Sequence, residues 1–143
     1  MAQAQPPQPN SQPSSMESAI DAAGTVLLVD DNAQNLELLQ AYLDDLECPI
    51  QTARDGIEAA QMIEQSPPDI ILLDVMMPRM SGFQLCAKLK GSPSTRDIPI
   101  IMVTALNEVG DVERAVESGA DDFLTKPVNK LELLTRVRSL LRV

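Results

Sequence analysis

The sequence predicts an α/β fold built on a doubly wound, five-stranded parallel sheet with helices on both faces. Two observations support it. Between residues 24 and 143, short apolar runs alternate five times with segments of helical periodicity. The run Ile70–Asp74 is apolar without alternation and lies between Pro67-Pro68 and Pro78, which is typical of a strand buried on both faces. Repeated β-α units join parallel strands by right-handed crossovers, and the favoured strand order is the flavodoxin-like 2-1-3-4-5.

The composition of the chain limits the kinds of function and partner that the protein can have. The chain has 143 residues, a net charge of −10 and 2% aromatic residues, so we expect one aliphatic-cored domain. The negative charge argues against nucleic acid or an anionic membrane as a direct partner. Neither a secretory signal nor a membrane-spanning run is visible, so a cytoplasmic protein is expected. Cys48 and Cys86 form no CxxC motif, and reduced thiols are the simplest interpretation.

The chain contains no histidine. This excludes general acid–base catalysis by histidine, Ser-His and Cys-His nucleophile pairs, and zinc sites with histidine ligands. Any chemistry must therefore use carboxylates, hydroxyls and amines.

The first 23 residues are rich in Gln, Pro, Ser and Ala. Such a segment cannot bury enough apolar area to offset the entropy of ordering. We expect residues 1–23 to be a disordered tail or linker, with at most a weak helical turn near 15–22, and residues 24–143 to form the domain.

The first two β-α units have clear boundaries. Val26–Val29 is predicted as a buried strand and Ile50–Ala53 as a shorter strand near an edge. Asn32 is predicted to cap the intervening helix. The apolar positions of that helix are Leu36, Leu39, Leu43 and Leu46. Asp55 and Glu58 predict a capping box for a helix over 56–65.

The later elements follow the same logic. After the strand Ile70–Asp74, a helix over 81–90 ends at Gly91, and the fourth strand runs from Ile98 to Thr104 with Pro99 at its start. Asn107 is predicted to cap a helix over 108–118, which Gly119 ends.

The last unit begins with the short strand Phe123–Thr125. Asn129 and Glu132 predict a capping box for the final helix. The predicted buried stripe of that helix is Leu131, Leu134 and Val137 or Arg138, onward to Leu141.

Chemically useful side chains stand at the carboxyl ends of these strands. Asp30 and Asp31 follow the first strand and Asp74 ends the third, and these strands are neighbours in the predicted order. Three adjacent carboxylates repel one another, and a divalent cation such as Mg²⁺ relieves the repulsion. Thr104 and Lys126 end the fourth and fifth strands. A carboxylate flanked by a metal, a hydroxyl and an ammonium is arranged to receive a phosphoryl group.

Each residue alone has an ordinary structural interpretation. An Asp-Asp pair after a strand often caps a helix, a threonine at a strand end often bonds to backbone, and a lysine before Pro127 is often a surface residue. The combination at four strand ends favours a site.

Four segments in order resemble the response-regulator receiver family of two-component signalling. They are VLLVDDN (26–32), DVMMPRMSG (74–82), VTA (103–105) and GADDFLTKP (119–127). The resemblance covers about residues 24–143. It implies that Asp74 is the phospho-acceptor, that Asp31, Asp74 and the Met76 carbonyl bind Mg²⁺ directly, and that Asp30 acts largely through water. It also implies a cis peptide bond between Lys126 and Pro127. Only a peptide bond that precedes proline adopts the cis form at a modest cost in free energy.

The resemblance further implies a phosphorylation-controlled switch. Thr104 would move toward the phosphoryl group while Phe123 turns inward, although Phe123 is also a plausible core aromatic. The output face would combine the helix over 108–118, the strand Phe123–Thr125 and the final helix. Met76 and Leu106 are apolar where a polar side chain could orient an attacking water, so we hypothesise slow self-dephosphorylation.

The function implied is a single-domain receiver that takes a phosphoryl group from a histidine kinase or a histidine phosphotransfer protein. It would be a signalling switch rather than an enzyme, acting on a downstream protein target and able to form a phosphorylation-dependent homodimer. Three alternatives stay open: an N-terminal receiver fragment of a larger effector, a binding-only receiver, and an aspartyl-phosphate phosphatase. Met76 counts against the phosphatase, because such an enzyme is expected to carry a second acid at that position.

Overall fold

The fold is described from a computed structural model that defines residues 24–105 and 109–141. The predicted tail, the Asn107 cap and Leu106 lie outside these ranges. Within them, no helix is both long and apolar enough to span a bilayer.

The sheet has the predicted topology. Its five strands are all parallel and lie in the order β2-β1-β3-β4-β5. They are β1 (Val26–Val29), β2 (Ile50–Ala53), β3 (Ile70–Asp74), β4 (Ile100–Thr104) and β5 (Asp122–Thr125). The edge strand β2 is half-buried, whereas every residue of β3 and β4 is buried. This difference explains why β3 is continuously apolar whereas β2 includes the polar residues Gln51 and Thr52.

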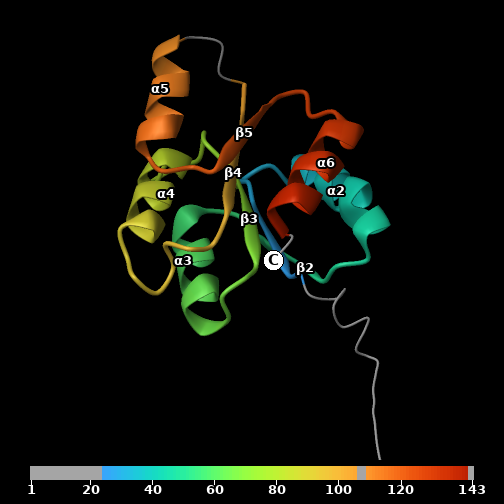
Figure 1. Ribbon diagram of the computed structural model, residues 1–143, viewed down its shortest axis with the longest axis horizontal. Helices are drawn as coiled ribbons and strands as arrows, with labels where there is room; N and C mark the ends of the chain where they lie inside the picture. Colours follow the sequence, from blue (N-terminus) through green and yellow to red (C-terminus); the bar gives the residue numbers. More distant parts are fainter. Residues whose placement is uncertain (1–23, 106–108, 142–143) are drawn as a thin grey trace, which may run out of the picture.

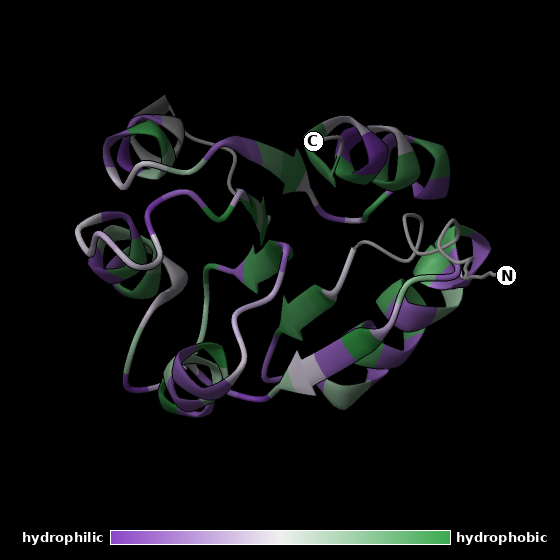
Figure 2. Ribbon diagram, turned by 60° about the horizontal axis from the view of Figure 1, so that its bottom comes forward, coloured by the Kyte–Doolittle hydropathy of each residue, from purple (hydrophilic) through white to green (hydrophobic). Residues whose placement is uncertain are grey.

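Helices cover both faces of the sheet (Figure 1). The two on one face are α2 (Ala33–Leu43) and α6 (Lys130–Leu141). The three on the other face are α3 (Gly56–Gln65), α4 (Gly82–Lys90) and α5 (Val109–Glu117). A 3₁₀ turn, η1 (Asp44–Leu46), follows α2. Figure 2 shows the inner strands mainly in green, the colour of hydrophobic residues, and the helices with both green and purple segments.

The strand residues divide between two cores. Val26 and Leu28 pack with the buried leucines of α2 and α6. Leu27 and Val29 pack on the side of α3 and α4. This alternation follows from the two-residue period of a strand, and it fixes β1 so that the residue after Val29 emerges at the carboxyl edge of the sheet.

The helix caps follow the sequence in part. Asn32 accepts a hydrogen bond from the Asn35 N–H at 3.0 Å, as predicted. Asp55 accepts from the Glu58 N–H at 2.8 Å, but Glu58 accepts from the Arg54 N–H and does not close the predicted box.

Asn129 likewise accepts from the N–H of Glu132. The carboxylate of Glu132 instead pairs with Arg136 at 3.2 Å. A complete capping box that the sequence reading missed joins Ser81 and Gln84 at the start of α4.

Two element predictions were wrong in detail. Strand β4 begins at Ile100 rather than Ile98, because Pro99 cannot donate to the ladder. Leu131 is 71% exposed, whereas the buried residues of α6 are Leu133, Leu134 and Val137. Two positions along a helix correspond to a rotation of about 200°, so burying Leu133 turns Leu131 to the outside.

Candidate functional site

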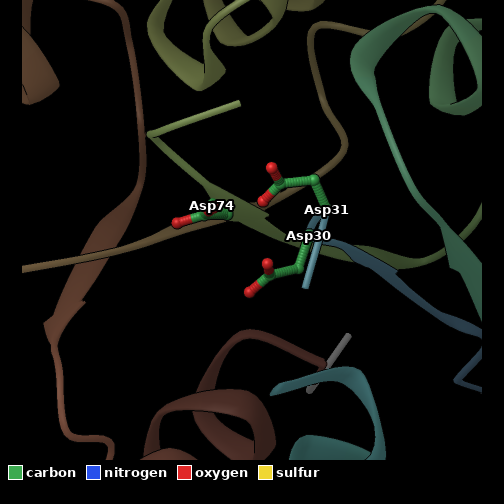
Figure 3. Close-up of side chains that lie close together, drawn as sticks. All are labelled: Asp30, Asp31 and Asp74. Carbon is green, nitrogen blue, oxygen red and sulfur yellow. The ribbon is translucent and has the colours of Figure 1, made fainter. Parts of the chain in front are cut away.

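Three carboxylates meet at the carboxyl edge of the sheet. Asp30 and Asp31 directly follow β1, and Asp74 is the last residue of β3. Because Val29 is paired with Leu73, the next residues, Asp30 and Asp74, lie side by side at the carboxyl ends of β1 and β3. One oxygen from each of the three acids lies within 4.8 Å of the others. Figure 3 shows the three carboxylates directed to the same side of the strand ends.

Two of these acids are buried and one is exposed. Asp30 and Asp74 are each 3% exposed, whereas Asp31 is open to solvent. The Asn32 N–H donates to Asp30 Oδ1 at 2.8 Å, and the Asn35 amide donates to Oδ2 at 3.4 Å. Burial, followed by the charge of Asp30, raises the pKa of Asp74, against the opposing effect of Lys126.

Lys126 supplies the positive charge of the cluster. Its Nζ lies 3.1 Å from Asp74 Oδ1 and 3.8 Å from Asp30 Oδ2. The backbone N–H of Lys126 donates to the carbonyl of Thr104 at 2.8 Å, which anchors the end of β5 to β4. The Lys126–Pro127 peptide bond is cis, the isomer that the resemblance implies.

The Thr104 hydroxyl is buried without a protein partner. Thr104 ends β4, is 2% exposed, and its Oγ1 makes no hydrogen bond within the described part of the chain. A buried hydroxyl in this condition costs about 1–3 kcal/mol. A bound ligand that forms a hydrogen bond with the Thr104 hydroxyl would remove this cost.

The loop after β3 is held close to Asp74 by its backbone. The Val75 N–H donates to the Val103 carbonyl, and the Gly82 N–H donates to the Val75 carbonyl. A Cβ on Gly82 would collide with the Asp74 carbonyl oxygen and lie 2.8 Å from the Val75 Cα. Glycine is therefore required at position 82 for this close approach. Met76 is 71% exposed on the loop.

Phe123 lies away from the acid cluster. It is half-buried on β5 and packs against the core on the side of α3 and α4, so the core interpretation describes its position in this structure.

The structure also places two arginines beside the site that sequence reasoning missed. Arg54 donates from Nη2 to the Asp31 carbonyl oxygen at 3.1 Å. Arg79, whose φ is 67°, forms a 2.8 Å ion pair with Asp55. These residues lie in the loops after β2 and β3, and their sequence signal was only that charged residues flank the expected loops.

A cavity of about 410 Å³ opens beside the acids. It lies between α2 and the loop that follows β5. Asp30 and Lys126 form its polar end, and Leu38, Tyr42 and Val128 are among its apolar lining. The charged cluster is thus accessible along a partly apolar wall.

The donor set fits a hard divalent cation. The three acids provide only oxygen atoms, their spacing permits convergence on one ion, and their mutual repulsion favours a cation between them. Mg²⁺ suits such a site because it is held by few carboxylates and retains water ligands.

Comparison with known proteins gives a consistent result. The family model of the response regulator receiver domain matches residues 26–138. Response regulator PleD of Caulobacter vibrioides is 51% identical over 117 residues, which are 82% of this chain and 26% of PleD. The DNA-binding dual master transcriptional regulator RpaA of Synechocystis is 41% identical over 117 residues, 82% of this chain and 48% of RpaA. The chain spans about a quarter to a half of the length of these relatives.

Solved structures agree. The signal receiver domain of a histidine kinase from Syntrophus aciditrophicus is 41% identical, with a TM-score of 0.79, covering 83% of this chain and 90% of that one. The receiver domain of sensor histidine kinase PA1611 from Pseudomonas aeruginosa, which has a magnesium ion coordinated in its active-site cleft, is 30% identical with a TM-score of 0.78. That match covers 85% of this chain and 99% of the other.

Proposed function

Because this chain belongs to the response-regulator receiver family, we propose that it is a switch that accepts a phosphoryl group on Asp74. The observation that carries the proposal is the environment of that carboxylate. Asp74 is buried beside two other acids, Lys126 lies 3.1 Å away, and a buried Thr104 hydroxyl lacks a partner. These are the groups that a transferred phosphoryl group needs around it.

The phosphoryl group would come from a phosphohistidine of another protein, since this chain has no histidine. In the transfer, an Asp74 oxygen attacks phosphorus and the N–P bond breaks, leaving its electron pair on the imidazole. The product is an acyl phosphate. Lys126 would neutralise one phosphoryl oxygen, and the Thr104 hydroxyl would donate to another.

We assign the cation site to Asp31, Asp74 and the Met76 carbonyl, with Asp30 acting largely through water. Bound Mg²⁺ would supply positive charge that offsets the charge on the phosphoryl oxygens. The hydrogen bonds to Asp30 from Asn32 and Asn35 hold its carboxylate in place for this role.

Phosphorylation would act at a distance through a population shift. The partnerless Thr104 hydroxyl would be drawn toward the phosphoryl group, and the vacated space would admit Phe123. The surface of α5, β5 and α6 would then change and bind a downstream protein or a second phosphorylated copy. Because Phe123 has no hydroxyl, this surface would differ mainly in shape and apolar area.

We propose a histidine kinase or a histidine phosphotransfer protein as the donor. Its helices would approach over the cavity between α2 and the β5–α6 loop, where apolar Leu38 is 46% exposed. Cytoplasmic residence is part of this proposal, because ATP-dependent phosphorylation of such donors takes place there. PleD and RpaA are longer than this chain. An adjoining effector domain would change the output of the receiver but not the residues that accept the phosphoryl group.

One experiment tests the acceptor role. The 143-residue chain is incubated with Mg²⁺ and acetyl phosphate, and intact mass is measured before and after hydroxylamine. We expect one phosphoryl group on the wild type, removed by hydroxylamine and absent in Asp74→Asn. Asp45→Asn, which changes a distant exposed acid, is the matched control and should label normally. An unlabelled wild type, or a label that persists in Asp74→Asn, would contradict the proposal.

A further inference from the structure

The loop between β2 and α3 contacts both of the loops to which we assign cation ligands. On one side, Arg54 donates from Nη2 to the carbonyl oxygen of Asp31 at 3.1 Å. Asp31 is the exposed member of the acid cluster and lies outside the sheet, so ladder hydrogen bonds do not hold it. The Arg54 guanidinium therefore restrains the backbone that carries this acid.

On the other side, Asp55 restrains the loop after β3. Its Oδ2 lies 2.8 Å from Nη2 of Arg79, three residues beyond Met76. Arg79 has a φ of 67°, a left-handed conformation that is unfavourable for a residue with a side chain. A second contact adds to the ion pair, because Met80 packs so closely on Gly56 that a Cβ there would lie 2.9 Å from the Met80 sulfur.

The β2–α3 turn is itself well fixed, which a restraint requires. Ala53 pairs with Val29 in the sheet. The Arg54 N–H donates to the Glu58 carboxylate at 2.8 Å, and the Glu58 N–H donates to Asp55 Oδ1 at 2.8 Å. Arg54 and Asp55 are thus held between a strand end and a helix cap.

We propose that Arg54 and Asp55 are positioning residues for the divalent-cation site, holding the loops of Asp31 and Met76 at the spacing that binding requires. This inference rests on the proposed function. Ligands from separate loops must converge within a few tenths of an ångström, and prior ordering removes an entropy cost from binding. Restraint of this kind strengthens cation binding without any contact to the ion.

The charge of the arginines makes the proposal sharply testable. A guanidinium in a loop beside the cation site repels a divalent cation, so on electrostatics alone its removal should tighten Mg²⁺ binding or leave it unchanged. Positioning predicts the opposite sign. Arg54→Gln and Arg79→Gln each delete a positive charge and one cross-loop contact, and therefore separate the two effects.

The Mg²⁺ dissociation constant of the full chain is measured by isothermal titration calorimetry, with the melting temperature recorded alongside. We expect Arg54→Gln to weaken binding about three- to tenfold and Arg79→Gln about two- to threefold, below the range for groups bonded to a ligand atom directly. Arg54→Lys, which keeps one donor, should restore part of the loss. Asp55→Asn keeps the helix cap. Because Asp55 acts on this loop through Arg79, the double variant Asp55→Asn, Arg79→Gln should bind Mg²⁺ little more weakly than Arg79→Gln alone.

The matched control is Lys130→Gln, which deletes one positive charge from the exposed pair with Asp45 and should leave Mg²⁺ affinity unchanged. In Lys130→Gln the rate of phosphorylation at saturating Mg²⁺ should also match the wild type. If Arg54→Gln and Arg79→Gln bind Mg²⁺ as tightly as the wild type or more tightly, this inference is overturned and the proposed function is not affected. A wild type that binds no Mg²⁺ would overturn both this inference and the proposed function.

Discussion

The Nζ of Lys126 lies 3.1 Å from Oδ1 of Asp74, although 52 positions separate the two residues. The lysine is 29% exposed at its side chain and the aspartate only 3%, so the ion pair reaches from solvent into the buried end of β3. Lys126 therefore opposes the rise in the pKa of Asp74 that burial and the charge of Asp30 cause.

Asp74→Asn should be more stable than the wild type at pH 7 without divalent cations. Burial raises the pKa of Asp74, with the charge of Asp30 adding to the effect. The folded protein therefore binds this proton more tightly than the unfolded chain does, and stability is lost as pH rises through the raised pKa. We expect a melting temperature about 4 °C higher for the variant, with the difference shrinking as pH falls toward 4. Added Mg²⁺ should favour the wild type. Equal melting temperatures across this pH range would contradict the expectation.

Thr104→Val should leave the unphosphorylated protein as stable as the wild type or more so, by up to about 1 kcal/mol, because it removes a buried hydroxyl that has no partner. The same variant should label on Asp74 but lose the structural response, measured as the change in backbone amide chemical shifts of β5 after phosphorylation. Thr125→Val, the exposed neighbour paired with it on β5, should respond normally. Marked destabilisation of Thr104→Val would show that the hydroxyl has a structural partner.

Gly82→Ala should destabilise the protein and impair phosphorylation together. The new Cβ would collide with the Asp74 carbonyl oxygen, and relieving the overlap must move either α4 or the reactive residue. We expect a loss of about 1–3 kcal/mol in the free energy of unfolding, measured by urea denaturation. Gly91→Ala is the control, because Gly91 has a φ of −86° that alanine adopts freely. Similar losses in the two variants would refute this account of Gly82.

Met76→Asn combined with Leu106→Glu should shorten the lifetime of the acyl phosphate. A polar side chain near the phosphoryl group can orient the attacking water, whereas the apolar pair cannot. We expect phosphate loss to accelerate by about tenfold, below the effect of a fully positioned general base.

The measurement is phosphate release from purified phosphoprotein. Leu131→Asn changes an apolar residue that is as exposed as Met76, 71% in each case, and should not alter the rate. If the double variant loses phosphate at the wild-type rate, the apolar pair does not set the lifetime.

Most of the fold could be predicted because its signals are local. The uninterrupted apolar run of β3, the short strand β2 and the caps at Asn32 and Asp55 depend on spacings of a few residues, and each occurs where expected. The convergence of Asp30, Asp31 and Asp74 also followed from sequence, because neighbouring parallel strands bring their carboxyl ends to one edge.

The remaining features depend on atoms far apart in the chain. Leu131 and Leu133 are both leucines near the start of α6, and only the rotation of that helix against α2 and the sheet decides which is buried. Glu58 could have bonded to the N–H of Asp55, but that of Arg54 lay within reach instead. No local pattern distinguishes these outcomes.

By itself, then, the sequence determined the strand order, the position of the acids and the residue types around Asp74, because backbone periodicity and sheet topology dictate them. Only the tertiary structure decided that the Thr104 hydroxyl lacks a partner and that Arg54 and Asp55 connect three loops around the site. Those features arise from side-chain packing between segments, where distances of a few tenths of an ångström determine whether a hydrogen bond forms.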